Sequence, residues 1–140
     1  MKIGVILMAA NFFLGSCTNE VSPLKIGVDA CDNCKMTISD ARFGAEIVTR
    51  KGRNYKFDDI SCLLNFMHGG SLKKTEIEAT YLTDYCSPHL LIPVSKCTLS
   101  KSEQYGSPMN GNVASFANVD SATFYNGAKE GTILLWNKLE

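Results

Sequence analysis

The sequence has no run of about 20 apolar residues, the length that a membrane-spanning helix needs. Its 14 Lys and Arg balance 14 Asp and Glu, so neither sign of charge is in excess. That balance argues against a nucleic-acid-binding protein and against electrostatic attachment to a membrane surface. Only 2 residues are His. The sequence shows no Ser/His/Asp arrangement, no Gly-rich phosphate loop and no carboxylate pair with a catalytic role, so we do not expect an enzyme.

The N-terminus is typical of a bacterial lipoprotein signal peptide. Met1-Lys2 is a short basic start, and residues 3–14 are apolar apart from one Asn and one Gly. Small residues then precede a cleavage point. Leu14-Gly15-Ser16-Cys17 resembles the lipobox, whose Cys is acylated and becomes the first residue of the mature protein. The alternative is an ordinary signal peptide with a chance Cys.

We therefore expect a signal peptide over residues 1–16 and an anchor on Cys17, on the extracytoplasmic, periplasm-facing side of a bacterial membrane. Several acyl chains on one Cys anchor a protein stably. Residues 17–24 are expected to form the lipidated N-terminus and a tether. The length that remains suits one compact domain over residues 25–140.

The first half of that domain is expected to be strand, turn, strand and helix. Alternating apolar residues over 43–49 predict a half-buried strand, and Lys51-Gly52 predicts a turn into a second strand over 53–57. Asp58 or Asp59 is expected to cap a helix that Gly69-Gly70 ends. Its apolar stripe is formed by Ile60, Leu63, Leu64 and Met67.

The second half repeats this pattern. The expected elements are a strand over 76–85, an edge strand over 90–94 that contains Pro93, a long loop over 98–112, a strand over 113–116, a helix over 121–129 capped by Asp120, and a strand over 132–136. The sequence thus predicts an α+β fold with antiparallel strands. Two small strand-strand-helix units, about 25–72 and 73–140, would result from an internal duplication.

Cys31-Asp32-Asn33-Cys34-Lys35-Met36 is the most informative stretch, and three interpretations compete. A zinc site needs a second pair of Cys or His ligands, which the sequence lacks. A thioredoxin-like redox site needs a helix directly after the motif, but residues 37–39 are not helical in pattern. A resting disulfide between Cys31 and Cys34 stays open.

The third interpretation is a soft-metal site. Thiolate and thioether ligands select Cu(I) over harder ions. If residues 34–38 are extended, Cys34 and Met36 point to the same side and their sulfurs meet one ion. The alternative for Met36 is packing in the core.

Further sulfur atoms are spread along the chain. With Cys17 acylated, five thiols remain, an odd number in an oxidising compartment. Cys62 lies opposite the apolar stripe of its helix, so it faces the other half, a partner or the metal. Met109 stands in a polar loop, where it is either a ligand or tucked under its own loop. Cys86 and Cys97 either bridge each other or are buried singly.

Several motifs together resemble the NosL family, in coherent order and over nearly the whole chain after the leader. They are residues 29–40 around the two Cys, Phe43-Gly44-Ala45, Phe57-Asp58-Asp59-Ile60, Ser107-Pro108-Met109 and Ala114-Ser115-Phe116. Many relatives have Gly where this chain has Lys35, and many have Gly where it has Asn110.

The resemblance implies a function. NosL proteins are lipoproteins of nitrous-oxide-respiring bacteria that act as copper chaperones for nitrous oxide reductase, together with a membrane ABC-transporter complex. Their fold is built from two small α+β units. Carried over by position, Cys34, Met36 and Met109 are the expected Cu(I) ligands. Cys31 matches the motif and is either a further ligand, a bystander or a disulfide partner, and Cys62 is a weaker candidate.

The leading hypothesis is therefore a Cu(I) metallochaperone without chemistry of its own. Two alternatives remain open at this point. One is an exported thiol-disulfide oxidoreductase that uses Cys31 and Cys34. The other is a non-catalytic surface lipoprotein held together by disulfides.

Overall fold

The computed structural model describes residues 20–140. The predicted signal peptide and the predicted lipidation site Cys17 lie outside the described residues. Within the described part, neither α-helix has the length and apolar character that crossing a bilayer requires.

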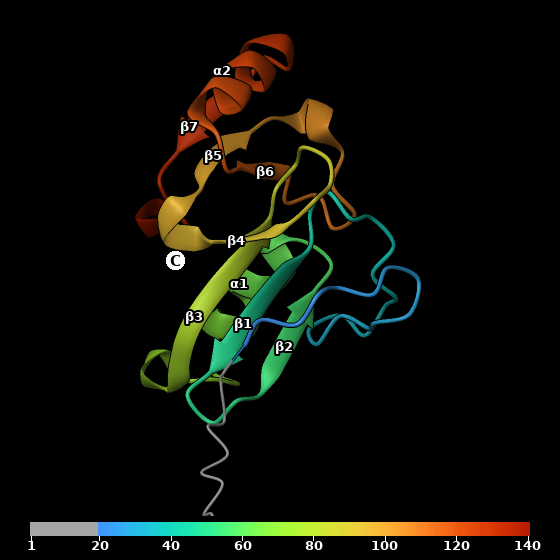
Figure 1. Cartoon of the computed structure of the whole chain (residues 1–140), viewed down its shortest axis with the longest axis vertical. Coiled ribbons are helices and arrows are strands. Elements are labelled where there is room, and N and C mark those ends of the chain that lie inside the picture. Colours follow the sequence, from blue (N-terminus) through green and yellow to red (C-terminus); the bar gives the residue numbers. More distant parts are fainter. Residues whose placement is uncertain (1–19) are drawn as a thin grey trace, which may run out of the picture.

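The first sheet has four antiparallel strands in the order β2-β1-β3-β4. They are β1 (Ala45–Thr49), β2 (Asn54–Phe57), β3 (Ile77–Thr83) and β4 (Leu91–Pro93). Helix α1 (Ile60–His68) follows β2 and packs on one face of this sheet (Figure 1). The predicted strand-turn-strand-helix order is confirmed. The strand with Pro93 is at the edge of the sheet, as its missing N–H group requires.

The central strand β1 corrects the expectation of a half-buried strand, because all five of its residues are buried. Residues 20–24 lie over the face of the sheet opposite α1 (Figure 1). The Ser22 N–H donates to the Glu46 carboxylate (2.8 Å), and Leu24 packs against the core. A Cβ on Gly44 would lie 2.2 Å from a Leu24 methyl group, so a larger residue there would have to displace the docked Leu24 side chain. Part of the predicted tether is thus docked on the sheet.

The second sheet has three antiparallel strands in the order β6-β5-β7. They are β5 (Thr98–Lys101), β6 (Val113–Phe116) and β7 (Thr132–Leu134). β5 corrects the predicted long loop over 98–112. Its four residues contain a single apolar side chain, Leu99, and it is a strand because both of its neighbours pair with it.

Helix α2 (Val119–Ala128) lies against the second sheet. Its N-cap is Asn118, whose side chain accepts the Asp120 N–H (2.7 Å), so the predicted cap Asp120 is instead in the first turn. Four short 3-10 turns complete the fold: η1 (Lys74–Glu76), η2 (Val94–Lys96), η3 (Glu103–Tyr105) and η4 (Trp136–Lys138).

The two sheets share one topology. In each, two strands, a helix and a third strand follow one another, and the first strand lies in the middle: β2-β1-β3 and β6-β5-β7. The α+β class with antiparallel strands is confirmed. β3 and β4, which follow residue 72, belong to the first sheet. The internal duplication remains a prediction that the shared topology favours.

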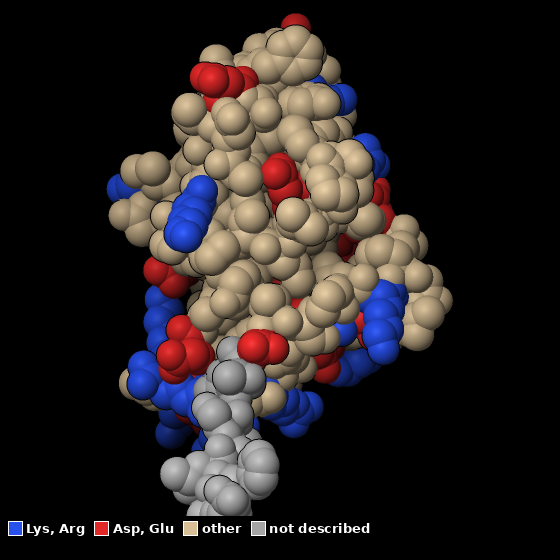
Figure 2. Space-filling model, viewed as in Figure 1, with Lys and Arg blue, Asp and Glu red and all other residues tan. Residues whose placement is uncertain are grey.

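The first half, formed by the first sheet with α1, is joined to the second half, formed by the second sheet with α2, through the end of β3. The Tyr85 N–H donates to the Ser115 carbonyl (2.7 Å), and Tyr85 packs edge-on against other rings. The rings that it meets edge-on are Phe43, Tyr105 and Tyr125, and the ring of Phe116 is tilted against it. A second core cluster also draws on both halves: it contains Cys31, Cys62 and Leu82 from the first, and Leu99 and Val113 from the second. Packing is therefore continuous across the junction. On the face in Figure 2, charges of both signs intermingle around the first sheet, in agreement with the balanced composition.

Candidate metal centre

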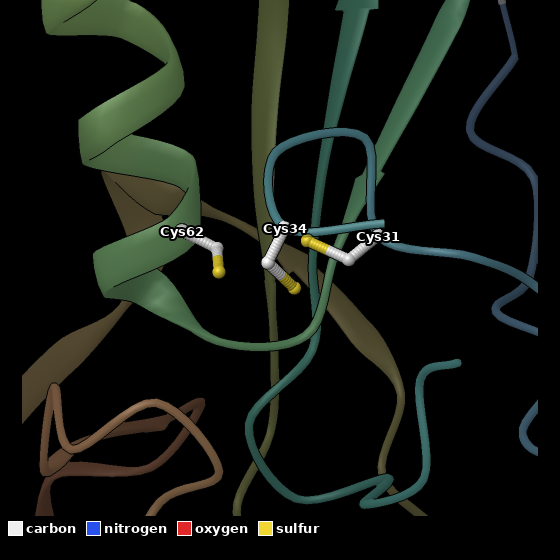
Figure 3. A group of neighbouring side chains, drawn as sticks. All are labelled: Cys31, Cys34 and Cys62. Atoms are coloured by element: carbon white, nitrogen blue, oxygen red, sulfur yellow. The ribbon is translucent and has the colours of Figure 1, made fainter. Parts of the chain in front are cut away.

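Three thiols meet where the first half contacts the second. The Sγ atoms of Cys31, Cys34 and Cys62 all lie within 4.8 Å of one another. Cys31 and Cys34 project from one loop and Cys62 projects from the start of α1, with the sulfurs grouped between them (Figure 3). Cys31 and Cys62 are fully buried, whereas Cys34 is partly exposed. Cys34 is therefore the thiol that an incoming group reaches first.

A tight loop presents the first two thiols. The Cys31 N–H donates to the Met36 carbonyl (2.8 Å), and the Lys35 N–H donates back to the Cys31 carbonyl (2.9 Å). Asp32 fixes this loop to the edge strand β2. Its carboxylate accepts the Lys56 N–H (2.8 Å), and its own N–H donates to the Lys56 carbonyl (2.7 Å). The loop is thus held at both its base and its tip.

The backbone at Lys35 corrects the premise that residues 34–38 are extended. Lys35 has a φ of 65°, in the left-handed region, so the chain turns between Cys34 and Met36. Met36 ends up 48% exposed, and no contact places its side chain among the thiols. The left-handed φ also explains why glycine suits this position in the relatives, since glycine adopts it without steric cost.

This conformation predicts how substitutions at Lys35 affect stability. A left-handed φ costs an L-residue about 1–2 kcal/mol, most for a β-branched one. In urea titrations of the reduced apoprotein, we expect the free energy of unfolding of Lys35→Val to be about 1–2 kcal/mol lower than that of Lys35→Gly. The side chain is exposed, so lost packing contributes little. Equal stability of the two variants would contradict the left-handed assignment.

Cys62 is buried on the side of α1 opposite its apolar stripe. That side faces the loop of Cys31 and Cys34, which explains why a residue outside the stripe has no exposure. Burial raises the pKa of the Cys62 thiol, and the adjacent Cys31 thiol raises it further. Without a metal, Cys62 therefore keeps its proton well above neutral pH.

Asp59 caps α1 directly beside Cys62. One carboxylate oxygen accepts the N–H groups of Ser61 (2.8 Å) and Cys62 (3.2 Å). This confirms the predicted cap. The preceding Asp58 is buried as well, and burial raises its pKa.

Met109 lies on a loop of the second half that reaches the same end of α1. Its carbonyl accepts from the Ser61 hydroxyl (3.5 Å), and its side chain packs partly buried against the core cluster that contains Cys31 and Cys62. Asn110, at the second position where relatives have Gly, has a φ of 56°. Asn tolerates this left-handed conformation better than most residues.

The remaining two cysteines lie apart from this cluster. All five cysteines of the described chain are free thiols, so Cys86 and Cys97 are not bridged. The Cys97 thiol donates to the Pro93 carbonyl (3.4 Å), and burial raises its pKa to about 12. Neither residue belongs to the three-thiol group.

The spacing of the three thiols suits a soft metal ion. With metal–thiolate bonds of about 2.3 Å, two thiolates on a line are about 4.6 Å apart and three in a plane are about 4.0 Å apart. Separations within 4.8 Å accommodate both geometries after small adjustments. Within residues 20–140, no fourth Cys, His, Asp or Glu joins the group, as a closed tetrahedral zinc site would require.

The structure thus changes the relative standing of the expected ligands. It brings together Cys31 and Cys62, the two weakest candidates, with Cys34. For Cys62, the sequence did carry a signal of this role, because the residue lies on the side of its helix opposite the apolar stripe. Met109 is on an adjacent loop, and Met36 is on the thiol loop but faces outward.

Comparison with known proteins identifies the fold and the family. The crystal structure of the copper chaperone NosL from Shewanella denitrificans matches with a TM-score of 0.70 and 15% sequence identity, over 85% of this chain and 94% of that chain. At this identity the likeness concerns the fold. A search among curated proteins found no match. The NosL family profile matches residues 25–140, most of the chain, and the chain therefore belongs to the NosL family.

Proposed function

We propose that this protein is a Cu(I) chaperone that holds the ion at Cys31, Cys34 and Cys62. The observation that carries the proposal is the convergence of three thiols, two of them fully buried, in a protein of the NosL family. Sulfur ligands favour Cu(I). Two or three of them satisfy Cu(I), whereas zinc would lack a fourth ligand from the described chain.

Partial access to the site suits transfer of the ion. Cys34 is partly exposed and Met36, on the same loop, is about half exposed. A ligand of a recipient can therefore approach from this side while Cys31 and Cys62 still hold the ion. Met36 and Met109 are proposed as thioether ligands that assist at different stages, Met36 at the surface and Met109 from the second half.

We further propose the setting of this transfer. The copper serves nitrous oxide reductase, with a membrane ABC-transporter-type complex as the second partner, and Cys17 anchors the protein on the periplasm-facing side of the membrane. Support comes from the family and from the leader motif ending at Cys17. Mass spectrometry of the protein from its membrane tests the anchor, because an unmodified N-terminus would contradict it.

The test of copper binding is a competition titration. Reduced protein, starting at Cys17 with that residue replaced by Ser, is titrated with Cu(I) against a chromogenic chelator under nitrogen. We expect one tightly bound Cu(I) per chain. No binding in competition with the chelator would contradict the proposed function.

The oxidoreductase alternative has one observation in its favour, the proximity of Cys31 and Cys34. It requires a thiol with a lowered pKa. Cys62, the third member of the group, has a raised pKa, and the loop of Cys31 and Cys34 is not the start of a helix. A disulfide-exchange assay separates the two functions, because the chaperone should show no exchange above that of a simple thiol.

A further inference from the structure

The carboxylate of Asp59 connects the two halves at the metal centre. Besides capping α1, it accepts three hydrogen bonds from the second half through its other oxygen, Oδ2. The donors are the Ser107 hydroxyl (2.8 Å), the Met109 N–H (3.0 Å) and the Gly111 N–H (3.3 Å). Asp59 is 1% exposed, so water does not compete for these bonds.

The Met109 loop lies so close to α1 that it has little freedom. A Cβ on Gly111 would be 3.1 Å from Ser61 Cβ and 3.2 Å from Asp59 Oδ2. The loop also closes on itself, because the Ser107 hydroxyl accepts the Asn112 N–H (2.8 Å). Close packing, the internal hydrogen bond and the three bonds to Asp59 together fix the loop against α1.

The carboxylate is held in its ionised form. Burial acts to raise the pKa of Asp59, but the hydrogen bonds from Ser61, Ser107, Cys62 and Met109 outweigh this and lower it. Both oxygens are fully used by these donors, so Asp59 has no lone pair directed at a metal. Its influence on the site must pass through the groups it holds.

We infer that Asp59 is a positioning residue that places the Met109 thioether beside the thiols. The N–H groups of Cys62 and Met109 donate to the two different oxygens of this one carboxylate. Cys62 is part of the thiol group, and Met109 packs against the core cluster that contains it. The expected effect on copper binding rests on the proposed function, whereas the placement of the loop does not.

Asp59→Asn separates the two tasks of the carboxylate. Asn is as good an N-cap as Asp, so its oxygen can still accept the N–H groups of Ser61 and Cys62. Its amide nitrogen is then directed at the loop and cannot accept from Met109 or Gly111. The helix keeps its cap while the loop loses its anchor.

The first readout needs no copper. The chain from Cys17 onward contains three methionines, Met36, Met67 and Met109, so 13C-methyl labelling gives three NMR signals. We expect Asp59→Asn to shift and sharpen the Met109 signal toward that of a free side chain, and to leave Met67 on α1 unchanged. An unchanged Met109 signal would overturn the inference, and so would an equal change at Met67, which indicates general loosening.

The second readout is Cu(I) affinity in a double-mutant cycle. If Asp59 acts through Met109, Asp59→Asn weakens binding about as much as Met109→Ile does, and the double variant is no weaker than either one. Additive losses would overturn that route. Asn118→Ala, which removes the cap of α2, is the matched control and should leave affinity unchanged. If the unaltered protein binds no Cu(I), the proposed function fails, while the NMR result still decides the placement of Met109.

Discussion

Replacing Cys34 by Ser is expected to weaken Cu(I) binding by about a hundredfold. Zinc sites with four thiolate and imidazole ligands have binding free energies of about 10–16 kcal/mol, so one ligand accounts for about 3 kcal/mol. By this measure, the loss of one ligand corresponds to about a hundredfold in Kd. Serine keeps the size of the side chain but offers a hard, neutral oxygen that Cu(I) disfavours. Competition with a chromogenic Cu(I) chelator measures the loss.

Cys97→Ser is the matched control. This thiol is also partly buried, but it donates to the Pro93 carbonyl outside the three-thiol group, and a serine hydroxyl can make the same bond. We expect its Cu(I) affinity to equal that of the unaltered protein. Equal affinity of Cys34→Ser would mean that the ion is held elsewhere.

Cu(I) binding is expected to weaken strongly on acidification. Because the pKa of Cys62 is raised, its thiol is protonated throughout the range from pH 6 to pH 8, and the ion must displace that proton. Each displaced proton makes Kd rise about tenfold for each unit by which the pH falls. From pH 8 to pH 6 we therefore expect a loss of at least about a hundredfold.

Cys62→Ser identifies the proton involved. Serine has no proton to release in this range. For each pH unit, log Kd should therefore change by about one less than it does in the unaltered protein. The affinities are obtained with a chelator calibrated at each pH. An affinity that does not change between pH 6 and pH 8 would show that Cys62 loses no proton to the metal.

The sequence predicts the local elements of this fold better than the surroundings of each element. Residues 54–57 and 60–68 carry strong patterns, and the residue type predicts a cap at Asp58 or Asp59, of which the structure selects Asp59. β5 has one apolar residue and is a strand only because β6 and β7 pair with it. The burial of Glu46 likewise depends on a segment more than 20 residues earlier in the chain.

The site shows the same division between local and distant information. The resemblance to the family predicts Cys34 and Met109 as ligands, because both stand in recognisable stretches. It does not give the left-handed turn at Lys35, which directs Met36 outward. Nor does it bring Cys62 to Cys31, since that contact depends on how the thiol loop packs across the start of α1.

X-ray absorption at the copper edge tests the central claim most directly. It is measured on reduced protein loaded with one equivalent of Cu(I). The account predicts an edge typical of Cu(I) and a first shell of only sulfur, about three atoms at about 2.3 Å. A first shell that contains nitrogen or oxygen, or one that Cys62→Ser leaves unchanged, would contradict a copper site built from Cys31, Cys34 and Cys62.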